Sequence, residues 1–534
     1  MTTGSIERAP LSAESPPSRP TDGSRPSRLA WRPAWLVHRD VLARTHELSD
    51  AGVFLAVGLL ALALLAFLGV IRTPVFVDEA DNVMGSCLMW RGQLPYRDFF
   101  SHHFPTPYYG LAALGERGAC SVLAARVFGV AVLTAVAGLF AWTARNPLAP
   151  LALLLVALTA PLYYAQLYLA ETWVSAGLIA SLALLTEPGR RLRGRVGFAV
   201  RALALLLLAS SSPLGLMMVA ILIPLVVLGA GRPYRPVLAA CAASILIWPL
   251  VLLVLGSLPA FVDQGLLFNT QIYSKFLTVK LTNPLSLSWE TLTFFRNRFS
   301  FVMDWLIGQQ TKATSESFAV FFELALATAF VALALGRRED RLFRLGAILM
   351  LPLALSRDGF HLSPFVVLAS FGCVQLLAPG IRRSGKLQLV AVVLVVLALR
   401  VYFFFLPERL DVSSELAKSM ERDRQVQTNT KPADTVLYLP ISPHGYLAEN
   451  RWPGSFYTSF LPWEAAIPGA EDRIIADIER NKVAMIVLDQ ETAIWGTYRI
   501  REYAPRLYAH IMSAYRPIDG GDRRRARYFI RAAP

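Results

Sequence analysis

Two adjacent carboxylates, Asp78 and Glu79, lie a few residues beyond the end of a long apolar run. A carboxylate can take the proton of an attacking hydroxyl, and a pair can help to hold a divalent cation such as Mg²⁺ or Mn²⁺. The pair could therefore supply a general base or part of a metal site. Residues 79–91 have helical apolar spacing, which predicts an amphipathic helix at a membrane interface. A solvated acidic turn before an interfacial anchor explains the same residues without chemistry.

Several cationic or imidazole side chains could bind an anionic group. Arg suits a phosphate best because it donates two parallel hydrogen bonds, whereas an exposed Lys often contacts only water or lipid headgroups. Pro364, next to the last of these candidates, fits in the first turn of a helix and needs no functional explanation. The candidates are Arg97, His102 and His103 in residues 92–105, Lys275, Lys280, Arg296 and Arg298 in residues 257–316, and Arg357 and His361 in the turn 356–364.

A further carboxylate, Glu171, follows a Tyr-rich turn at the start of another apolar run. An ionisable group at that depth usually faces a polar cavity, although a side chain near a membrane surface can also simply reach water. Both interpretations fit, and Glu171 joins the candidate substrate-binding residues. His361 has no partner ligand four residues on, so the pattern does not favour a metal site there.

The elements that position these residues are membrane helices. Hydrophobic residues make up 54% of the 534-residue chain and charged residues only 17%, against about 25% in soluble domains. Apolar runs close to 20 residues match a hydrocarbon core of about 30 Å, where only helices pair every backbone polar group. About eleven transmembrane helices are predicted, at 51–71, 121–143, 147–164, 167–186, 197–211, 213–230, 236–256, 317–336, 342–356, 361–379 and 387–406.

Basic residues give this helix count an orientation. Residues 1–50 are predicted to form a disordered cytoplasmic tail. With this tail inside, the Arg-rich clusters in the tail and between the helices all fall on the cytoplasmic side, as the positive-inside rule requires. The net charge of +14 is therefore explained by topology, and no nucleic-acid partner is expected. The clusters are Arg28/Arg32/Arg39/Arg44, Arg190/Arg191/Arg193/Arg195, Arg232/Arg235, Arg337/Arg338/Arg341/Arg344 and Arg382/Arg383/Lys386.

The same orientation places the first loop (72–120), the second loop (257–316) and residues 407–534 outside the membrane, after a transmembrane domain at 51–406. Residues 435–439 and 483–488 read as strands and 471–482 as a helix, which predicts a small extracytoplasmic α/β domain. Cys87 and Cys120 both fall in the first loop. They form a disulfide or remain two unpaired small apolar residues, and the sequence does not choose between these.

The first loop resembles that of the GT-C superfamily of integral-membrane glycosyltransferases, which includes protein O-mannosyltransferase-like enzymes and the lipid A aminoarabinose transferase. Asp78-Glu79 and the segment 92–98 (Gly-Gln-Leu-Pro-Tyr-Arg-Asp) match as they stand. The resemblance implies an inverting glycosyltransferase of the bacterial inner membrane. Its donor would be a polyprenyl-phosphate-linked sugar, hexose or pentose, and its acceptor an envelope lipid, polysaccharide or protein. It also implies that Asp78 is the general base, with Glu79 orienting it or helping to hold a divalent cation. By the same resemblance, Glu171 is a second acidic residue and Arg357 or His361 holds the donor phosphate.

Two other classes of membrane protein remain as alternatives. A transporter or flippase would be expected to carry charges within its helices and inverted repeats, whereas here the charges gather at helix ends. An O-antigen ligase or polymerase usually gathers Arg and His in one late loop. No P-loop, nucleophile elbow or Gly-x-Gly-x-x-Gly turn is present, which suits a reaction whose energy arrives in a preactivated substrate.

Overall fold

The computed structural model describes residues 50–143, 146–186, 194–213, 215–220, 234–276, 363–364, 366–372, 374, 416–418, 420–494, 496–518 and 522–532. The helices expected at 317–336, 342–356 and 387–406 lie outside the described residues, as do most of the helix expected at 213–230 and part of that at 361–379.

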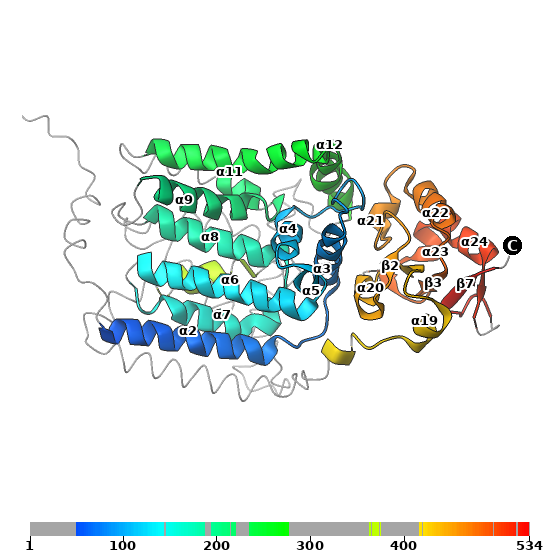
Figure 1. The fold of residues 1–534 in the computed structure, drawn as a ribbon, viewed down its shortest axis with the longest axis horizontal. Helices are drawn as coiled ribbons and strands as arrows, with labels where there is room; N and C mark the ends of the chain where they lie inside the picture. The colour runs from blue at the N-terminus through cyan, green and yellow to red at the C-terminus, as the bar shows by residue number, and fades with distance from the viewer. Residues whose placement is uncertain are drawn as a thin grey trace, which may run out of the picture. The chain divides into compact units, whose positions relative to one another are not determined.

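Six long apolar helices run alongside one another (Figure 1). Each begins and ends within three residues of its predicted position, because the extent of each apolar run sets the extent of its helix. Contacts join α2 to α7, α6 to α8, and α9 to both α8 and α11. The helices are α2 (Asp50–Val70), α6 (Val122–Thr143), α7 (Ala149–Tyr163), α8 (Ala170–Thr186), α9 (Gly194–Ala209) and α11 (Tyr234–Val254).

Two of the described helices contain segments long and apolar enough to cross a membrane, Gly52–Val70 and Val122–Thr143. Their buried faces share one core with α7, α8 and α9. Leu and Val on other faces of α2 remain exposed, as at Val57 and Leu65, which suits contact with lipid.

The first loop contains α3 (Val77–Trp90), α4 (Thr106–Ala112) and α5 (Glu116–Ala119). The helix predicted at 79–91 corresponds to α3, and nine of its fourteen residues are buried. The physical reason is that α4 packs on one side of α3 and α20 (Pro443–Glu449) on another. The two helices lie close together at Gly85, where an added Cβ would lie 2.5 Å from the ring of Tyr108.

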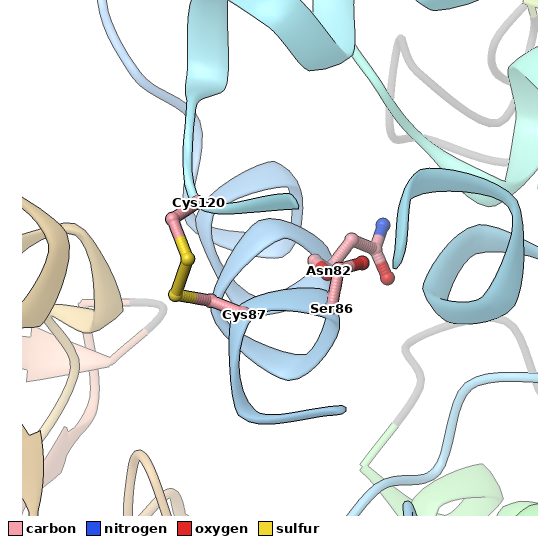
Figure 2. Close-up of a disulfide and its surroundings, with 4 residues drawn as sticks. All are labelled: Asn82, Ser86, Cys87 and Cys120. Atoms are coloured by element: carbon pink, nitrogen blue, oxygen red, sulfur yellow. Dashed lines mark hydrogen bonds between the residues drawn. A yellow bond between two sulfur atoms is a disulfide. The ribbon is translucent and has the colours of Figure 1, made fainter. Parts of the chain in front are cut away.

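A disulfide joins Cys87 of α3 to Cys120, just after α5 (Figure 2). Of the two interpretations that the sequence left open, the structure has the bonded one. The disulfide holds α3 beside the start of α6, which Ser121 precedes.

The described part of the second loop is helical. It comprises α12 (Leu258–Phe261), the π-helix η1 (Val262–Ile272) and the 3₁₀ turn η2 (Tyr273–Lys275). Gln264 and Asn269 of η1 bind the backbone of the first loop. Gln264 accepts from the Ser101 amide at 3.0 Å and donates to the Tyr96 carbonyl at 2.7 Å, while Asn269 donates to the His102 carbonyl at 2.8 Å.

The C-terminal domain, residues 416–532 as described, contains a five-stranded sheet of order β2-β1-β3-β7-β6. Strand β1 pairs in parallel with β2 and β3, and β7 pairs antiparallel with β3 and β6. The predicted strands at 435–439 and 483–488 and the helix at 471–482 correspond to β1, β3 and α22. The strands are β1 (Thr435–Leu439), β2 (Trp452–Pro453), β3 (Met485–Leu488), β4 (Ala493–Ile494), β5 (Tyr498–Arg499), β6 (Tyr515–Pro517) and β7 (Tyr528–Arg531), of which β4 and β5 form a separate pair.

Apolar side chains join this domain to both loops. Phe100 of the first loop and Phe268 of η1 belong to the same buried cluster as Phe456 and Trp463. The Phe100 amide also donates to the Phe456 carbonyl at 2.8 Å. The remaining helices of the domain are α19 (Arg424–Asn429), α21 (Pro462–Ala465), α22 (Ala470–Arg480), α23 (Ile500–Tyr503) and α24 (Pro505–Ala514).

Candidate active site

Asp78 and Glu79 diverge because they open a helix. Successive side chains of an α-helix are rotated by about 100°, so residues three and four positions apart share a face. Asp78 therefore shares a face of α3 with Asp81 and Asn82, whereas Glu79 is turned toward α6. Both acidic residues of the first turn also suit the positive end of the helix dipole, which alone would favour carboxylates there.

Glu79 is fully buried and paired with Arg126 of α6. The Arg126 guanidinium donates to both carboxylate oxygens, from Nε at 2.8 Å and from Nη2 at 2.6 Å. It also donates to the carbonyls of Ile71 and Thr73, which fixes the connection between α2 and α3. The Tyr168 amide donates to Glu79 as well, at 2.9 Å. Such a network is a structural anchor, because breaking a buried ion pair leaves an uncompensated charge.

This geometry differs from the sequence hypothesis that Glu79 orients Asp78 or holds a divalent cation. Both Glu79 oxygens accept charge-assisted bonds from a guanidinium, which a metal ion would have to displace. Within the described residues, no group of three or more His, Cys, Asp or Glu side chains is arranged to hold a metal ion. The donor set therefore does not fit a metal site built on Glu79.

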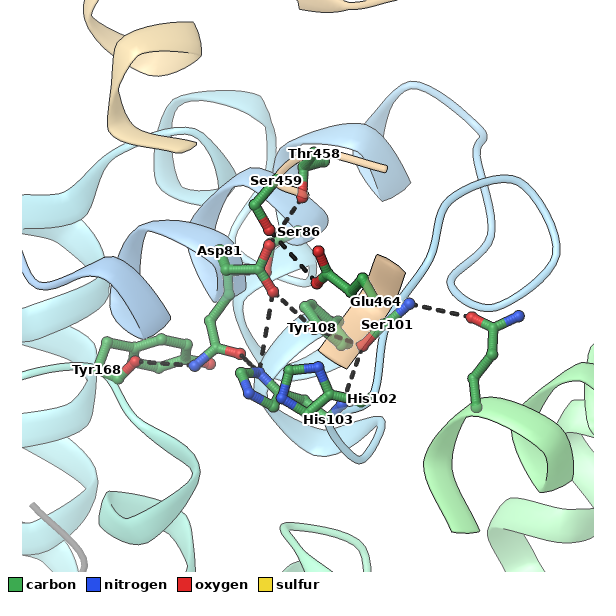
Figure 3. Close-up of polar contacts among 12 residues, drawn as sticks. Asp81, Ser86, Ser101, His102, His103, Tyr108, Tyr168, Thr458, Ser459 and Glu464 are labelled. Atoms are coloured by element: carbon green, nitrogen blue, oxygen red, sulfur yellow. Dashed lines mark hydrogen bonds and ion pairs between the residues drawn. The ribbon is translucent and has the colours of Figure 1, made fainter. Parts of the chain in front are cut away.

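Asp81, one turn beyond Asp78, lies in a polar cluster that both loops and the C-terminal domain build (Figure 3). Its carboxylate accepts from the Thr458 hydroxyl at 2.9 Å and from the Tyr108 hydroxyl at 3.5 Å, and lies 3.9 Å from Nδ1 of His103. Burial raises the pKa of Asp81, while a positive charge on His103 and the hydroxyl of Thr458 act to lower it.

Asn82 fixes the tautomer of His103. Its side-chain nitrogen donates to the Tyr168 carbonyl at 3.3 Å, so its Oδ1 must be the atom that lies 3.0 Å from Nδ1 of His103. An amide oxygen only accepts, and Nδ1 must therefore carry a hydrogen. The other ring nitrogen, Nε2, is left to accept a proton or, once protonated, to donate to an anion.

His102 differs electrostatically from its neighbour. Its ring packs among those of His103, Phe268 and Tyr273, with centroid distances of 4.3 to 5.7 Å. Burial, and then the charge of His103, hold the pKa of His102 well below its usual range. His102 is consequently neutral near pH 7 and can offer a phosphate a hydrogen bond but no charge.

A second buried carboxylate, Glu464 of α21, borders this cluster (Figure 3). It accepts from the Leu461 amide at 2.7 Å and from the Ser459 hydroxyl at 3.5 Å. Burial raises its pKa well above the usual value, and the nearby charge of Asp81 raises it further. The polar cluster therefore holds two carboxylates with raised pKa values, Asp81 and Glu464.

Three of the remaining predicted residues, Arg97, Glu171 and Lys275, lie within the described part of the chain. Arg97 is exposed and pairs with Asp98 at 2.8 Å. Glu171 lies, half-buried, in the first turn of α8, and Lys275 is exposed at the end of η2. The residues Lys280, Arg296, Arg298, Arg357 and His361 lie outside the described residues.

Sequence reasoning missed Arg126, Asp81, Asn82, Thr458 and Glu464. For Arg126 a signal existed, since an arginine inside a predicted membrane helix demands a partner. Asp81 and Asn82 could have been found from the helical spacing after Asp78. Thr458 and Glu464 carried no signal, because only the tertiary fold brings the C-terminal domain to the first loop.

Comparison with known proteins finds solved structures with a similar fold. No family model and no curated protein matches this sequence. The structure is similar to ArnT from Cupriavidus metallidurans bound to undecaprenyl phosphate, with a TM-score of 0.52, 13% identity, and coverage of 91% of this chain and 99% of that one. It is also similar to the Archaeoglobus fulgidus oligosaccharyltransferase in complex with Zn and sulfate, with a TM-score of 0.44, 12% identity, and coverage of 81% and 68%. The likeness to ArnT confirms the predicted GT-C fold of a helical membrane protein.

Proposed function

We propose that this protein is an inverting glycosyltransferase that moves a sugar from a polyprenyl-phosphate donor to an envelope acceptor at the outer face of the bacterial inner membrane. The fold supports this proposal, since the similar ArnT was solved with undecaprenyl phosphate. The observation that carries it is the face of α3 on which Asp78 lies one turn from Asp81 and Asn82, beside His103. About eleven membrane helices, with the C-terminal domain extracytoplasmic, complete the proposal.

Asp78 is the general base in this mechanism. As the acceptor hydroxyl attacks the anomeric carbon, the new glycosidic bond forms and the hydroxyl proton passes to the Asp78 carboxylate. The bond from the anomeric carbon to the phosphate oxygen breaks on the opposite face of the sugar, which inverts the configuration. Polyprenyl phosphate leaves as an anion and needs no general acid, but it does need positive charge and hydrogen-bond donors around it.

His103 supplies that positive charge when protonated. The Asn82 contact leaves its Nε2 as the atom that donates to the leaving phosphate. His102 adds a neutral donor. Arg97, Lys275, Lys280, Arg357 and His361 remain proposed donor-phosphate ligands and Glu171 a proposed substrate-binding carboxylate, while Glu79 holds Arg126.

The test offers purified protein a panel of labelled polyprenyl-phosphate sugars, hexoses and pentoses, together with envelope extract. We expect transfer from at least one donor into a lipid, polysaccharide or protein fraction, with the opposite anomeric configuration in the product. Retained configuration would contradict the single displacement. No transfer from any donor, with vesicle uptake of a labelled lipid or solute instead, would favour the transporter.

A further inference from the structure

A cavity of about 340 Å³ lies between the first loop and the C-terminal domain. It opens on the side of α3 that carries Cys87, and Figure 2 shows Cys87 and Asn82 on opposite sides of this helix. Cys87 follows Asn82 by five positions, which corresponds to a rotation of about 140° around the helix axis. The cavity is therefore distinct from the polar cluster at Asp81 and His103.

The floor and one wall of this cavity suit the apolar face of a sugar ring. Met84 and Tyr446 are almost fully buried beneath it, and the Cys87–Cys120 disulfide lines it beside them. Trp452 forms a wall at β2, which is an edge strand of the sheet. Aromatic rings present a rigid apolar surface at low entropic cost, and pockets of about 300–1,000 Å³ accommodate small ligands.

The rim is positively charged. Arg91 and Arg117 are both exposed at the rim, where Glu116 is the single carboxylate among the lining residues. The Arg91 guanidinium lies 3.4 Å from the centre of the Trp452 ring. Arg451 adds a third positive charge from below, although its own donors are used by the Thr430 side chain and by nearby carbonyls. Guanidinium groups bind carboxylates and phosphates with two parallel hydrogen bonds.

We infer that this cavity is a subsite for an acidic sugar unit of the glycan acceptor, with the sugar ring over the apolar floor of Met84 and Tyr446 and its anionic group between Arg91 and Arg117. The inference rests on the proposed glycosyltransferase function and narrows its acceptor to an anionic glycan. Arg91 follows Asp78 by thirteen residues of α3, roughly 20 Å along the helix axis. The subsite thus holds a sugar distant from the reacting hydroxyl, and its loss weakens acceptor binding without changing the chemistry.

The test measures equilibrium binding of trigalacturonic acid, an acidic trisaccharide, to the purified full chain in detergent. Maltotriose, a neutral trisaccharide, is the uncharged control. We expect trigalacturonate to bind at least about tenfold more tightly than maltotriose, and the double variant R91Q/R117Q to lose about tenfold in affinity. Arg501→Gln removes an exposed arginine of α23 and should leave binding unchanged. Equal melting temperatures and an intact disulfide establish that the variants are folded.

Three results would overturn the inference: no binding of trigalacturonate, equal binding of the two sugars, or full affinity in the double variant. Binding of phosphatidylglycerol micelles that is lost in the double variant and is not displaced by trigalacturonate would assign the arginines to lipid headgroups and would also overturn it. The measurement uses no sugar donor. A failure to find glycosyl transfer therefore tests the proposed function separately.

Discussion

Thr458 donates its side-chain hydroxyl to the carboxylate of Asp81 at 2.9 Å, although the two residues are 377 positions apart in sequence. Through this bond the C-terminal domain contributes directly to the face of α3 that carries the proposed base. A domain that only selected an acceptor would not need to reach this carboxylate.

Thr458→Val should slow transfer and shift its pH dependence. The lost hydrogen bond to a charged group corresponds to about 1.5–3 kcal/mol, or at least about a tenfold loss in kcat/KM. Because the Thr458 hydroxyl lowers the pKa of Asp81, its removal raises that pKa and moves the acid limb of the pH–rate profile to higher pH. Thr458→Ser keeps the hydroxyl and should restore both. A uniform loss of rate with an unchanged pH profile would indicate a merely structural contact.

Asn82→Leu should weaken donor binding by releasing His103. Without the amide oxygen, the Nδ1 hydrogen loses its partner and the ring no longer presents Nε2 in a fixed direction. We expect KM for the donor to rise about tenfold, which corresponds to about 1.4 kcal/mol. An unchanged donor KM in Asn82→Leu would remove His103 from the proposed phosphate site.

Removal of either partner of the Glu79–Arg126 pair should destabilise the protein strongly. A buried charge left without its partner costs about 3–5 kcal/mol, so Glu79→Leu and Arg126→Met should each lower the melting temperature in detergent. Arg126 also binds backbone carbonyls, and the double variant should therefore remain below the wild type. Its loss should still be smaller than the sum of the single losses, and strict additivity would show that the pair is not coupled.

Glu464 should make the protein less stable as pH rises. The folded chain binds this proton more tightly than the unfolded chain, because burial raises the pKa of Glu464 above its usual 4.5. The free energy of unfolding therefore falls as pH increases from about 4.5 through the raised pKa. The melting temperature should fall less over this pH window in Glu464→Gln than in the wild type. The exposed Glu491→Gln serves as the matched control, and equal declines in all three proteins would contradict the account.

Reduction of the Cys87–Cys120 disulfide should lower stability. The bond closes a loop with a sequence separation of 33 residues, for which chain entropy predicts about 4 kcal/mol. Cys87→Ser should unfold at lower temperature than the wild type, and a reducing agent should affect the wild type but not the variant. Cys241→Ser is the control, since Cys241 is a free buried thiol.

The sequence predicted those parts of the fold that depend on local pattern. The bounds of α2 and α6 follow from apolar runs of fixed length, and those of β1 from its Val, Leu and Tyr residues. The burial of α3 could not be predicted, because its amphipathic spacing suits a membrane surface as well as a protein interior. Packing against α4 and α20 decides between these.

In the candidate site, too, local features could be predicted from the sequence and long-range contacts could not. The Asp78-Glu79 pair was visible in the sequence, and two adjacent carboxylates suggested a shared role. The geometry of the helix instead turns their side chains onto different faces. The partner of Glu79 is on α6 and that of Asp81 is in the C-terminal domain. Such long-range pairs depend on how the elements pack, and no local spacing encodes them.

The most direct test of the central claim is the initial rate of sugar transfer by Asp78→Asn, measured with the donor that the wild type uses. The account predicts a loss of at least about a hundredfold, within the usual 10²–10⁴-fold contribution of a positioned base, with donor binding retained. Asp263→Asn, which removes an exposed carboxylate from η1, should transfer at the wild-type rate. Transfer by Asp78→Asn at the rate of the wild type would contradict the account.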